Sequence, residues 1–176
     1  RRFLSDLPLR TPPVTVLAGR CHEHEAVPYK GLDSLVDALA RRLRALSRPE
    51  QDALLPENAG ALVRLFPVLG GVKALAARTE GGVADVAEPR RLAVVALRAL
   101  LARMSMAGPV VLAVDDVQWS DSDSAALVAD MLRPPDAPAV LLVLACRRDA
   151  LSRAPVVARV LEVARQHGYA VNRNAQ

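Results

Sequence analysis

Three short stretches of the chain are apolar at nearly every position, and they predict three strands. A run without polar alternation suits a strand that is buried on both faces of a parallel sheet. The stretches are residues 14–18, 110–115 and 139–145. Helical patterns separate them, so we expect an α/β fold in which right-handed crossovers join the strands of one parallel sheet.

Apolar residues recur at helical spacing in most of the remaining chain. The expected helices cover residues 1–7, 32–47, 49–55, 61–69, 89–105 and 154–167, together with one that begins within 120–124 and ends at Leu132. Residues 70–88 are rich in Gly, Ala and Thr without a clear period, so we expect a loop there. We expect residues 168–176 to be disordered.

Size and composition are those of one domain with a substantial core. The chain has 176 residues, of which 52% are hydrophobic and only 3% aromatic, so Ala, Val and Leu must build that core. The formal net charge of +4 is carried mostly by arginines, many of them spaced as on the solvated face of a helix. Because charge alone is a weak sign of nucleic-acid binding, we do not expect that function.

Other features of the composition indicate a reduced, cytoplasmic protein with no membrane attachment. Cys21 and Cys146 lie far apart, in no metal or redox spacing. Charged residues interrupt every apolar run before it reaches the length of a membrane span. Residues 1–6 lack the apolar segment of a signal peptide. The chain begins within a helical pattern and without Met, so we expect it to be a piece of a longer polypeptide.

The strongest chemical signal is the pair of adjacent carboxylates, Asp115 and Asp116, that follows the second apolar run. Ligands of open α/β sheets bind at the carboxyl ends of strands, and two like charges at close range resist joint ionisation unless a cation is present. A Walker B segment has this pattern: its first Asp holds Mg²⁺, and the next acidic residue orients or deprotonates the attacking water. The alternative for Asp115 is a cap at the strand end, and Asp116 has a shorter reach than the commoner Glu.

Arg147 follows the third apolar run, which brings it beside the carboxylates if the two strands are neighbours. A guanidinium in this position could sense or stabilise a γ-phosphate. The alternative is an ion pair with Asp115, Asp116 or Asp121, which a bound nucleotide could break. Trp119 either packs beneath the loop or shapes the site directly.

The loop His22-Glu23-His24-Glu25 is a second candidate metal site. Its two histidines are only two residues apart, and no third ligand is evident nearby. A solvated loop is therefore the favoured interpretation, and zinc is not expected.

No phosphate-binding loop of the form Gly-x-x-x-x-Gly-Lys-Ser/Thr occurs in the sequence. Lys30 and Lys73 are the only lysines, and neither follows the strand and loop that this motif requires. The backbone N–H groups and the Lys of that loop provide most of the binding energy for a triphosphate. We therefore expect this chain alone to bind ATP weakly and not to hydrolyse it.

Four segments together resemble the ATPase module of bacterial STAND-class and AAA-type signalling proteins. Residues 110–121 resemble the Walker B strand with an Asp-Asp-x-x-Trp-x-Asp extension, and residues 141–149 resemble the sensor strand with its terminal Arg motif. Residues 19–23 with 28–30 resemble the segment after the second strand, and residues 1–7 resemble the helix that follows the phosphate loop. Such modules are often fused to serine/threonine kinase, cyclase or transcription-factor domains.

The resemblance implies an incomplete P-loop NTPase core of the ASCE or AAA-like kind over residues 1–150, with three strands and flanking helices. A C-terminal helix and tail follow at 151–176. The Walker A loop would lie just upstream of Arg1. Because the strand of that loop neighbours the sensor strand in such proteins, strand 139–145 would present an exposed apolar edge.

The resemblance also implies that the intact module binds ATP and Mg²⁺. Asp115 would be the metal ligand, Asp115 and Asp121 would bind the cofactor, and Asp116 and Arg147 would act in catalysis. Binding or hydrolysis of Mg-ATP would then control a covalently attached output domain. The alternative is a non-enzymatic interaction scaffold with a degenerate NTPase fold, which could self-associate through the exposed sheet edge.

Overall fold

The computed structural model describes residues 13–23, 28–79 and 89–173. The helix expected at residues 1–7 lies outside this part of the chain. Among the described residues, no helix combines the length and the apolar character needed to cross a membrane.

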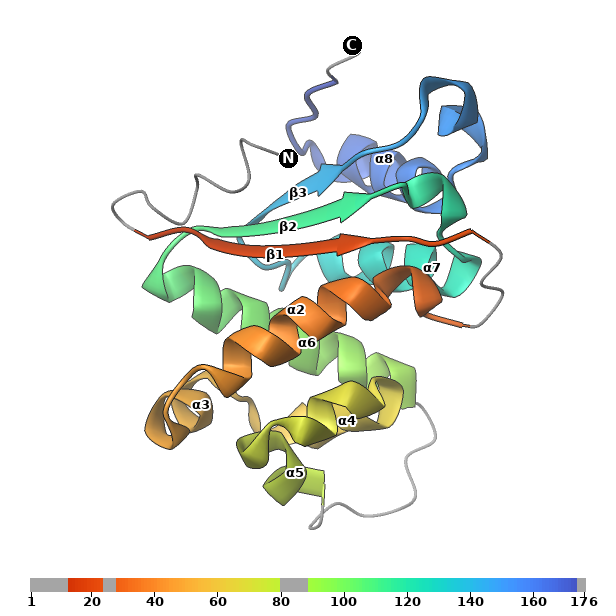
Figure 1. Ribbon diagram of the computed structural model, residues 1–176. Helices are drawn as coiled ribbons and strands as arrows, with labels where there is room; N and C mark the ends of the chain where they lie inside the picture. The colour runs from red at the N-terminus through yellow and green to blue at the C-terminus, as the bar shows by residue number, and fades with distance from the viewer. Residues whose placement is uncertain (1–12, 24–27, 80–88, 174–176) are drawn as a thin grey trace.

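Over the described residues the sheet contains three parallel strands, as the sequence predicts. They are β1 (Thr15–Arg20), β2 (Val110–Asp115) and β3 (Val140–Leu144), in the order β1-β2-β3. In this register Arg20 lies opposite Asp115, and Val114 lies opposite Leu144. The carboxyl ends of the three strands therefore lie together at one end of the sheet (Figure 1).

In the described part of the chain, five α-helices lie between β1 and β2, and two more follow β2. The first five are α2 (Asp33–Arg44), α3 (Arg48–Leu54), α4 (Gly60–Leu65), α5 (Lys73–Thr79) and α6 (Pro89–Ala107), and the last two are α7 (Ser122–Leu132) and α8 (Pro155–His167). Short 3-10 helices are η2 (Lys30–Leu32), η3 (Glu57–Ala59), η4 (Pro67–Gly71), η5 (Val117–Trp119) and η6 (Arg148–Arg153). Helices lie where apolar spacing predicts them between residues 32 and 167, except that the one expected over 61–69 ends at Leu65 and is followed by η4, and the one expected over 32–47 ends at Arg44.

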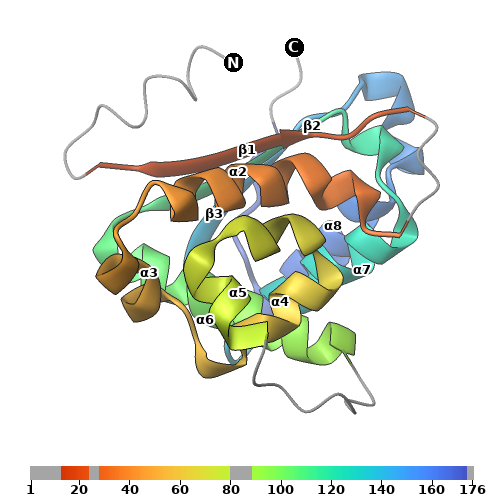
Figure 2. The same ribbon diagram turned by 60° about the horizontal axis from the view of Figure 1, so that its bottom comes forward.

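Helices α2, α6 and α7 lie against one face of the sheet (Figure 1). The strands occur in chain order, so right-handed crossovers place both connections on the same side. Leu17 and Leu112 of the sheet are buried together with Leu39 and Leu101 of the helices. Helices α3, α4 and α5 form a further layer, more distant from the sheet (Figure 2).

Helix α5 corrects the prediction of a loop at residues 70–88, because Lys73–Thr79 is helical. Ala74 and Leu75 of this helix are fully buried, so tertiary packing stabilises a helix too short to show a clear period. The carbonyl oxygen of the buried Gln51 side chain accepts the N–H of Ala74 at 3.3 Å. The remaining part of the expected loop, residues 80–88, lies outside the described residues.

Helix α8 packs against α7, and its Val156 is buried in the same core as the sheet. The chain continues in defined positions beyond the helix. The Tyr169 hydroxyl donates a hydrogen bond to the carbonyl oxygen of Leu132 at 2.8 Å, and the Tyr169 N–H donates to Ala164 at 3.0 Å. Part of the segment expected to be disordered is therefore anchored to α7 and α8.

Strand β3 forms an edge of the sheet, as expected: no further strand pairs with it among the described residues. Leu141, at the middle of this edge, is 55% exposed. An apolar side chain on an unpaired edge strand is uncommon, because such edges promote association.

Candidate functional site

The two carboxylates stand where β2 ends. Asp115 is the last residue of the strand, and Asp116 adopts a left-handed backbone conformation with φ 53° and ψ 38°. Asp tolerates this conformation better than most residues do. The resulting turn lets the Asp116 N–H donate to the Asp115 carboxylate at 3.0 Å and leads the chain into η5.

Backbone hydrogen bonds hold the ends of all three strands together. The Cys21 N–H donates to the carbonyl oxygen of Asp115 at 3.0 Å, which joins the end of β1 to β2. The Val117 N–H donates to the carbonyl oxygen of Ala145 at 3.0 Å, which joins the first turn after β2 to β3. The loops that follow the strands consequently form one continuous surface around the carboxylates.

Arg20, at the end of β1, forms an ion pair with Asp116. Its Nε lies 2.5 Å from Oδ2 of Asp116, and its Nη2 contacts the same oxygen. Ser34 fixes the backbone of Arg20 by accepting its N–H at 2.6 Å and donating to its carbonyl oxygen at 2.8 Å. Sequence reasoning assigned Arg20 to a loop and missed this role, although extending the strand by two residues would have placed Arg20 opposite Asp115.

Gln118 links Asp116 to the segment after β3. Its side-chain amide donates to Oδ1 of Asp116 at 3.2 Å, and its amide oxygen accepts the backbone N–H of Arg147 at 3.4 Å. Both carboxylate oxygens of Asp116 therefore accept hydrogen bonds from the protein. Gln118 was not recognised from the sequence, because nothing in the spacing distinguishes it from a surface amide.

The Arg147 guanidinium pairs with Asp149, through contacts of 3.0 and 3.2 Å. This ion pair takes the place of the one considered with Asp115, Asp116 or Asp121. The side chain is 68% exposed and lies at the end of the strand next to β2. A role toward a phosphate stays a prediction.

Asp121 is the N-cap of α7, and its carboxylate accepts four hydrogen bonds. The donors are the N–H groups of Tyr29 (3.2 Å), Gly31 (3.0 Å) and Ser124 (2.7 Å), and the Ser124 hydroxyl (2.5 Å). Partial burial acts to raise the pKa of Asp121, but the bonds from Ser124, Gly31 and Tyr29 outweigh it and hold the pKa below its usual value. Asp121 thus fixes the loop before α2 against α7, and the expected cofactor contact stays a prediction.

Gly31 leaves room for this close approach. A Cβ atom at this position would lie 3.1 Å from the Ser124 hydroxyl and 3.3 Å from Oδ2 of Asp121. The neighbouring Trp119 is 39% exposed, so it is not packed wholly beneath the loop. Part of the Trp119 side chain therefore lies on the protein surface.

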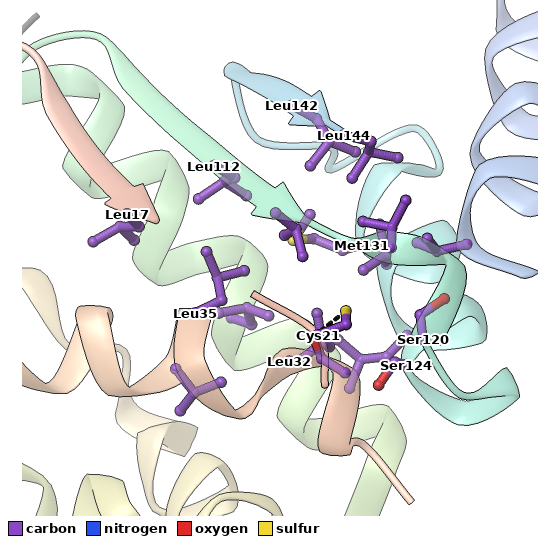
Figure 3. A pocket seen from close by; sticks show the side chains of 18 of the residues that line it. Leu17, Cys21, Leu32, Leu35, Leu112, Ser120, Ser124, Met131, Leu142 and Leu144 are labelled. Atoms are coloured by element: carbon purple, nitrogen blue, oxygen red, sulfur yellow. Dashed lines mark hydrogen bonds between the residues drawn. The ribbon is translucent and has the colours of Figure 1, made fainter. Parts of the chain in front are cut away.

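A cavity of about 40 Å³ lies beneath this surface, between the sheet and helices α2 and α7 (Figure 3). Its walls are mostly leucine and valine, and Cys21, Ser120 and Ser124 lie close together at one end of it (Figure 3). The Cys21 thiol donates to the carbonyl oxygen of Gly31 at 3.3 Å. The Ser120 hydroxyl is buried, and no partner for it is found among the described residues.

The donor set suits magnesium better than zinc. His22 is exposed, and His24 and Glu25 of the histidine-rich loop lie outside the described residues. In the described part of the chain no three His, Cys, Asp or Glu side chains are close enough to form a metal cluster. Mg²⁺ is usually held by one or two carboxylates, with water and substrate phosphates completing its shell, and Asp115 could supply such a carboxylate.

A parallel sheet with flanking helices, and a carboxylate pair at the end of its central strand, defines an α/β domain of the P-loop NTPase type. Comparison with protein families gives a match to the AAA ATPase domain over residues 1–144, and the chain belongs to this family. Searches of curated proteins and of solved structures returned no match. The chain is accordingly a nucleotide-binding, ATPase-like module, and intact members of the family use ATP with Mg²⁺.

Proposed function

We propose that this chain is the metal-binding and water-activating part of a regulatory ATPase in a multidomain bacterial signalling protein of the STAND class. Binding or hydrolysis of Mg-ATP would change the activity of an attached output domain, such as a serine/threonine kinase, a cyclase or a transcription factor. The phosphate-binding loop would be supplied by residues upstream of Arg1. The observation that carries the proposal is the position of Asp115 and Asp116 at the carboxyl end of the central strand.

Each functional residue at the carboxyl ends of the strands has a distinct role in the proposal. Asp115 holds Mg²⁺, which when bound neutralises the charge of the phosphate groups. Asp116 orients the attacking water and accepts its proton. Arg147 leaves Asp149 to contact the γ-phosphate, and Asp121 contacts the nucleotide from the start of α7, where it also holds the loop at Tyr29 in place.

The occupied state of Asp116 implies a control step. Arg20 contacts Oδ2 of Asp116 and Gln118 donates to Oδ1, so both residues compete with a water for this carboxylate. Arg20 is half exposed, with 52% of its side chain accessible, so its ion pair is weak enough to exchange. We infer that Arg20 holds Asp116 in an unreactive state until nucleotide binds.

The test compares this chain with a version extended upstream to include the preceding strand and loop. Binding of a fluorescent ATP analogue is measured with Mg²⁺ and with EDTA. We expect weak binding by the 176-residue chain and tight, Mg²⁺-dependent binding by the extended one. In the extended protein, Asp115→Asn should remove the Mg²⁺ dependence, whereas Asp136→Asn, at an exposed position, should have no effect.

Tight Mg²⁺-dependent binding by the 176-residue chain would overturn the need for an upstream loop. Absence of binding by both proteins would overturn the nucleotide site itself. An extended protein that hydrolyses ATP equally well with Asp116→Asn would contradict the role of that residue.

The exposed strand β3 favours a second candidate, an interaction scaffold that self-associates through its sheet edge. Light scattering of the 176-residue chain should then show dimers, and Leu141→Lys should convert them to monomers, because a charged residue protects a strand edge. In the ATPase proposal the upstream strand covers this edge, so the extended protein would be monomeric without any substitution.

A further inference from the structure

The positive charge of the chain is concentrated at its C-terminal end. Residues 147–173 contain six arginines and two acidic residues, a net charge of +4, which equals the net charge of the whole chain. The first 146 residues are therefore neutral overall. Such asymmetry is a property of a surface that meets an acidic partner.

An open groove of about 440 Å³ lies within this basic region. It runs between the second half of α8 and the segment that follows, where Gly168 (φ 70°) reverses the chain. Its lining residues are Leu161, Ala164, Arg165, Tyr169, Val171 and Arg173. The Tyr169 bonds to Leu132 and Ala164 hold the outer wall in place, so the groove is preformed.

The two arginines of the groove differ from others of this region. Arg147 pairs with Asp149, and Arg159 pairs with Glu162. Over the described residues, neither Arg165 nor Arg173 has an acidic partner. Arg165 lies in the last turn of α8, where the helix dipole stabilises a cation. Arg173 lies outside the helix, so the dipole does not account for its charge at this position.

Between these charges the surface is apolar. Val171 is 47% exposed, and the Tyr169 ring and Leu161 continue the apolar wall. A ligand for this groove consequently needs two anionic groups and an apolar group between them. The phosphate backbone of a nucleic acid has no apolar group that could contact Val171 and Leu161. The lining therefore favours a peptide over nucleic acid.

We propose that this groove binds an acidic peptide segment of a partner protein. Carboxylates of Asp or Glu pair with Arg165 and Arg173, and an apolar side chain of the peptide fills the hollow along Leu161 and Val171. The groove lies on α8 and the segment after it, and it shares no lining residue with the carboxylate site. It gives the module a docking surface that does not require ATP.

The probe is a short fluorescein-labelled peptide in which pairs of glutamates alternate with single leucines. Its binding to the 176-residue chain is measured by fluorescence anisotropy at increasing salt. We expect saturable binding that weakens as salt rises, because exposed ion pairs are screened. Three further probes separate the contributions: the same peptide with serine for leucine, the same peptide with lysine for glutamate, and a DNA duplex.

Arg165→Gln with Arg173→Gln should weaken binding of the glutamate–leucine peptide by up to about 30-fold, the limit for two exposed ion pairs of about 1 kcal/mol each. The matched control, Arg41→Gln with Arg42→Gln, removes the same charge from exposed positions of α2 and should leave binding within about twofold. Val171→Ser should weaken binding of the leucine-containing peptide and leave the weaker serine-containing peptide unaffected.

Three results would overturn the proposal. The first is that the glutamate–leucine peptide does not bind saturably. The second is that Arg41→Gln with Arg42→Gln weakens its binding as much as Arg165→Gln with Arg173→Gln does. The third is that the serine peptide or the DNA binds as tightly as the glutamate–leucine peptide or more tightly, which would show that the region acts by charge alone. Circular dichroism of each variant confirms that a loss of binding is not a loss of fold.

Discussion

The Asp121 carboxylate joins two parts of the chain that are 90 residues apart in sequence, the loop at Gly31 and the start of α7. A single ionised side chain accepts all the donors presented there, which a neutral amide cannot do because one of its two polar atoms is a donor. The serine- and aspartate-rich start of α7 predicted an N-cap. It did not identify which residue would cap, because the bonds from Tyr29 and Gly31 depend on the fold.

We predict that Asp121→Asn lowers the free energy of unfolding by about 1–3 kcal/mol at neutral pH, the range for buried hydrogen bonds to a charged group. The pKa of Asp121 is lowered in the folded protein, so its stabilisation is fully present above the unfolded value of about 3.9 and is lost as pH falls through the folded value. Urea unfolding at several pH values should show the difference from wild type shrinking in acid. Asp123→Asn, in the same turn, is the control and should cost less.

Arg20 should restrain Asp116 and not assist it. In the upstream-extended protein, Arg20→Gln is expected to raise the basal rate of ATP hydrolysis by up to about fivefold, because releasing an exposed ion pair is worth at most about 1 kcal/mol. Steady-state kcat is the measurement, with Arg41→Gln as the control. An unchanged or lower kcat would mean that Arg20 positions Asp116 for the reaction.

Removing the buried Ser120 hydroxyl should not destabilise the fold, in contrast to the substitution of Asp121. Because no partner satisfies it among the described residues, Ser120→Ala should leave stability unchanged or raise it by up to about 1 kcal/mol. Ser124→Ala, at the same end of the cavity, should instead lower stability by about 1 kcal/mol, because its hydroxyl donates to Asp121. Thermal unfolding of the two variants side by side tests the contrast.

Among the elements, the three strands were predictable and the short helix α5 was not. The strands are apolar along most of their length, so their signal is local. Helix α5 has only seven residues, and the groups that stabilise it come from elsewhere in the chain. The same limit applies to Gly19 and Arg20, which join β1 only because β2 pairs with them.

Gln51 shows how α5 is tied to its neighbours. Its amide nitrogen donates to the carbonyl oxygens of Leu43 and Leu46 at 3.0 and 3.1 Å, and its oxygen accepts the N–H of Ala74. One buried side chain thus satisfies the end of α2 and the start of α5, groups that a helix leaves unpaired.

Gln51→Leu should therefore lower the free energy of unfolding by about 2–3 kcal/mol, because it removes the side-chain bonds to Leu46 and Ala74 and one of the two bonds to the Leu43 carbonyl oxygen. Chemical denaturation provides the measurement. Glu57→Gln, at an exposed position nearby, should change stability by less than about 0.5 kcal/mol. A small effect of Gln51→Leu would indicate that α5 is held by its apolar contacts alone.

On the scale of the whole molecule, the sequence predicted the class of fold and the carboxylate pair at its centre. Both depend on local patterns, an apolar run and the residues directly after it. The surroundings of that pair could not be predicted, since Arg20 and Gln118 reach Asp116 through strand register and turn conformation. The basic groove beside α8 likewise depends on the chain reversal at Gly168, which only the structure shows.

The strand order has a consequence for how the protein folds. β2 and β3 are close in sequence and joined through α7, whereas the contact between Arg20 and Asp116 spans 96 residues. Closing so large a loop costs more entropy, and contacts of high sequence separation form slowly. We expect the β2–α7–β3 unit to form early and β1 to dock late, so the Arg20–Asp116 pair would appear only at the final stage of folding.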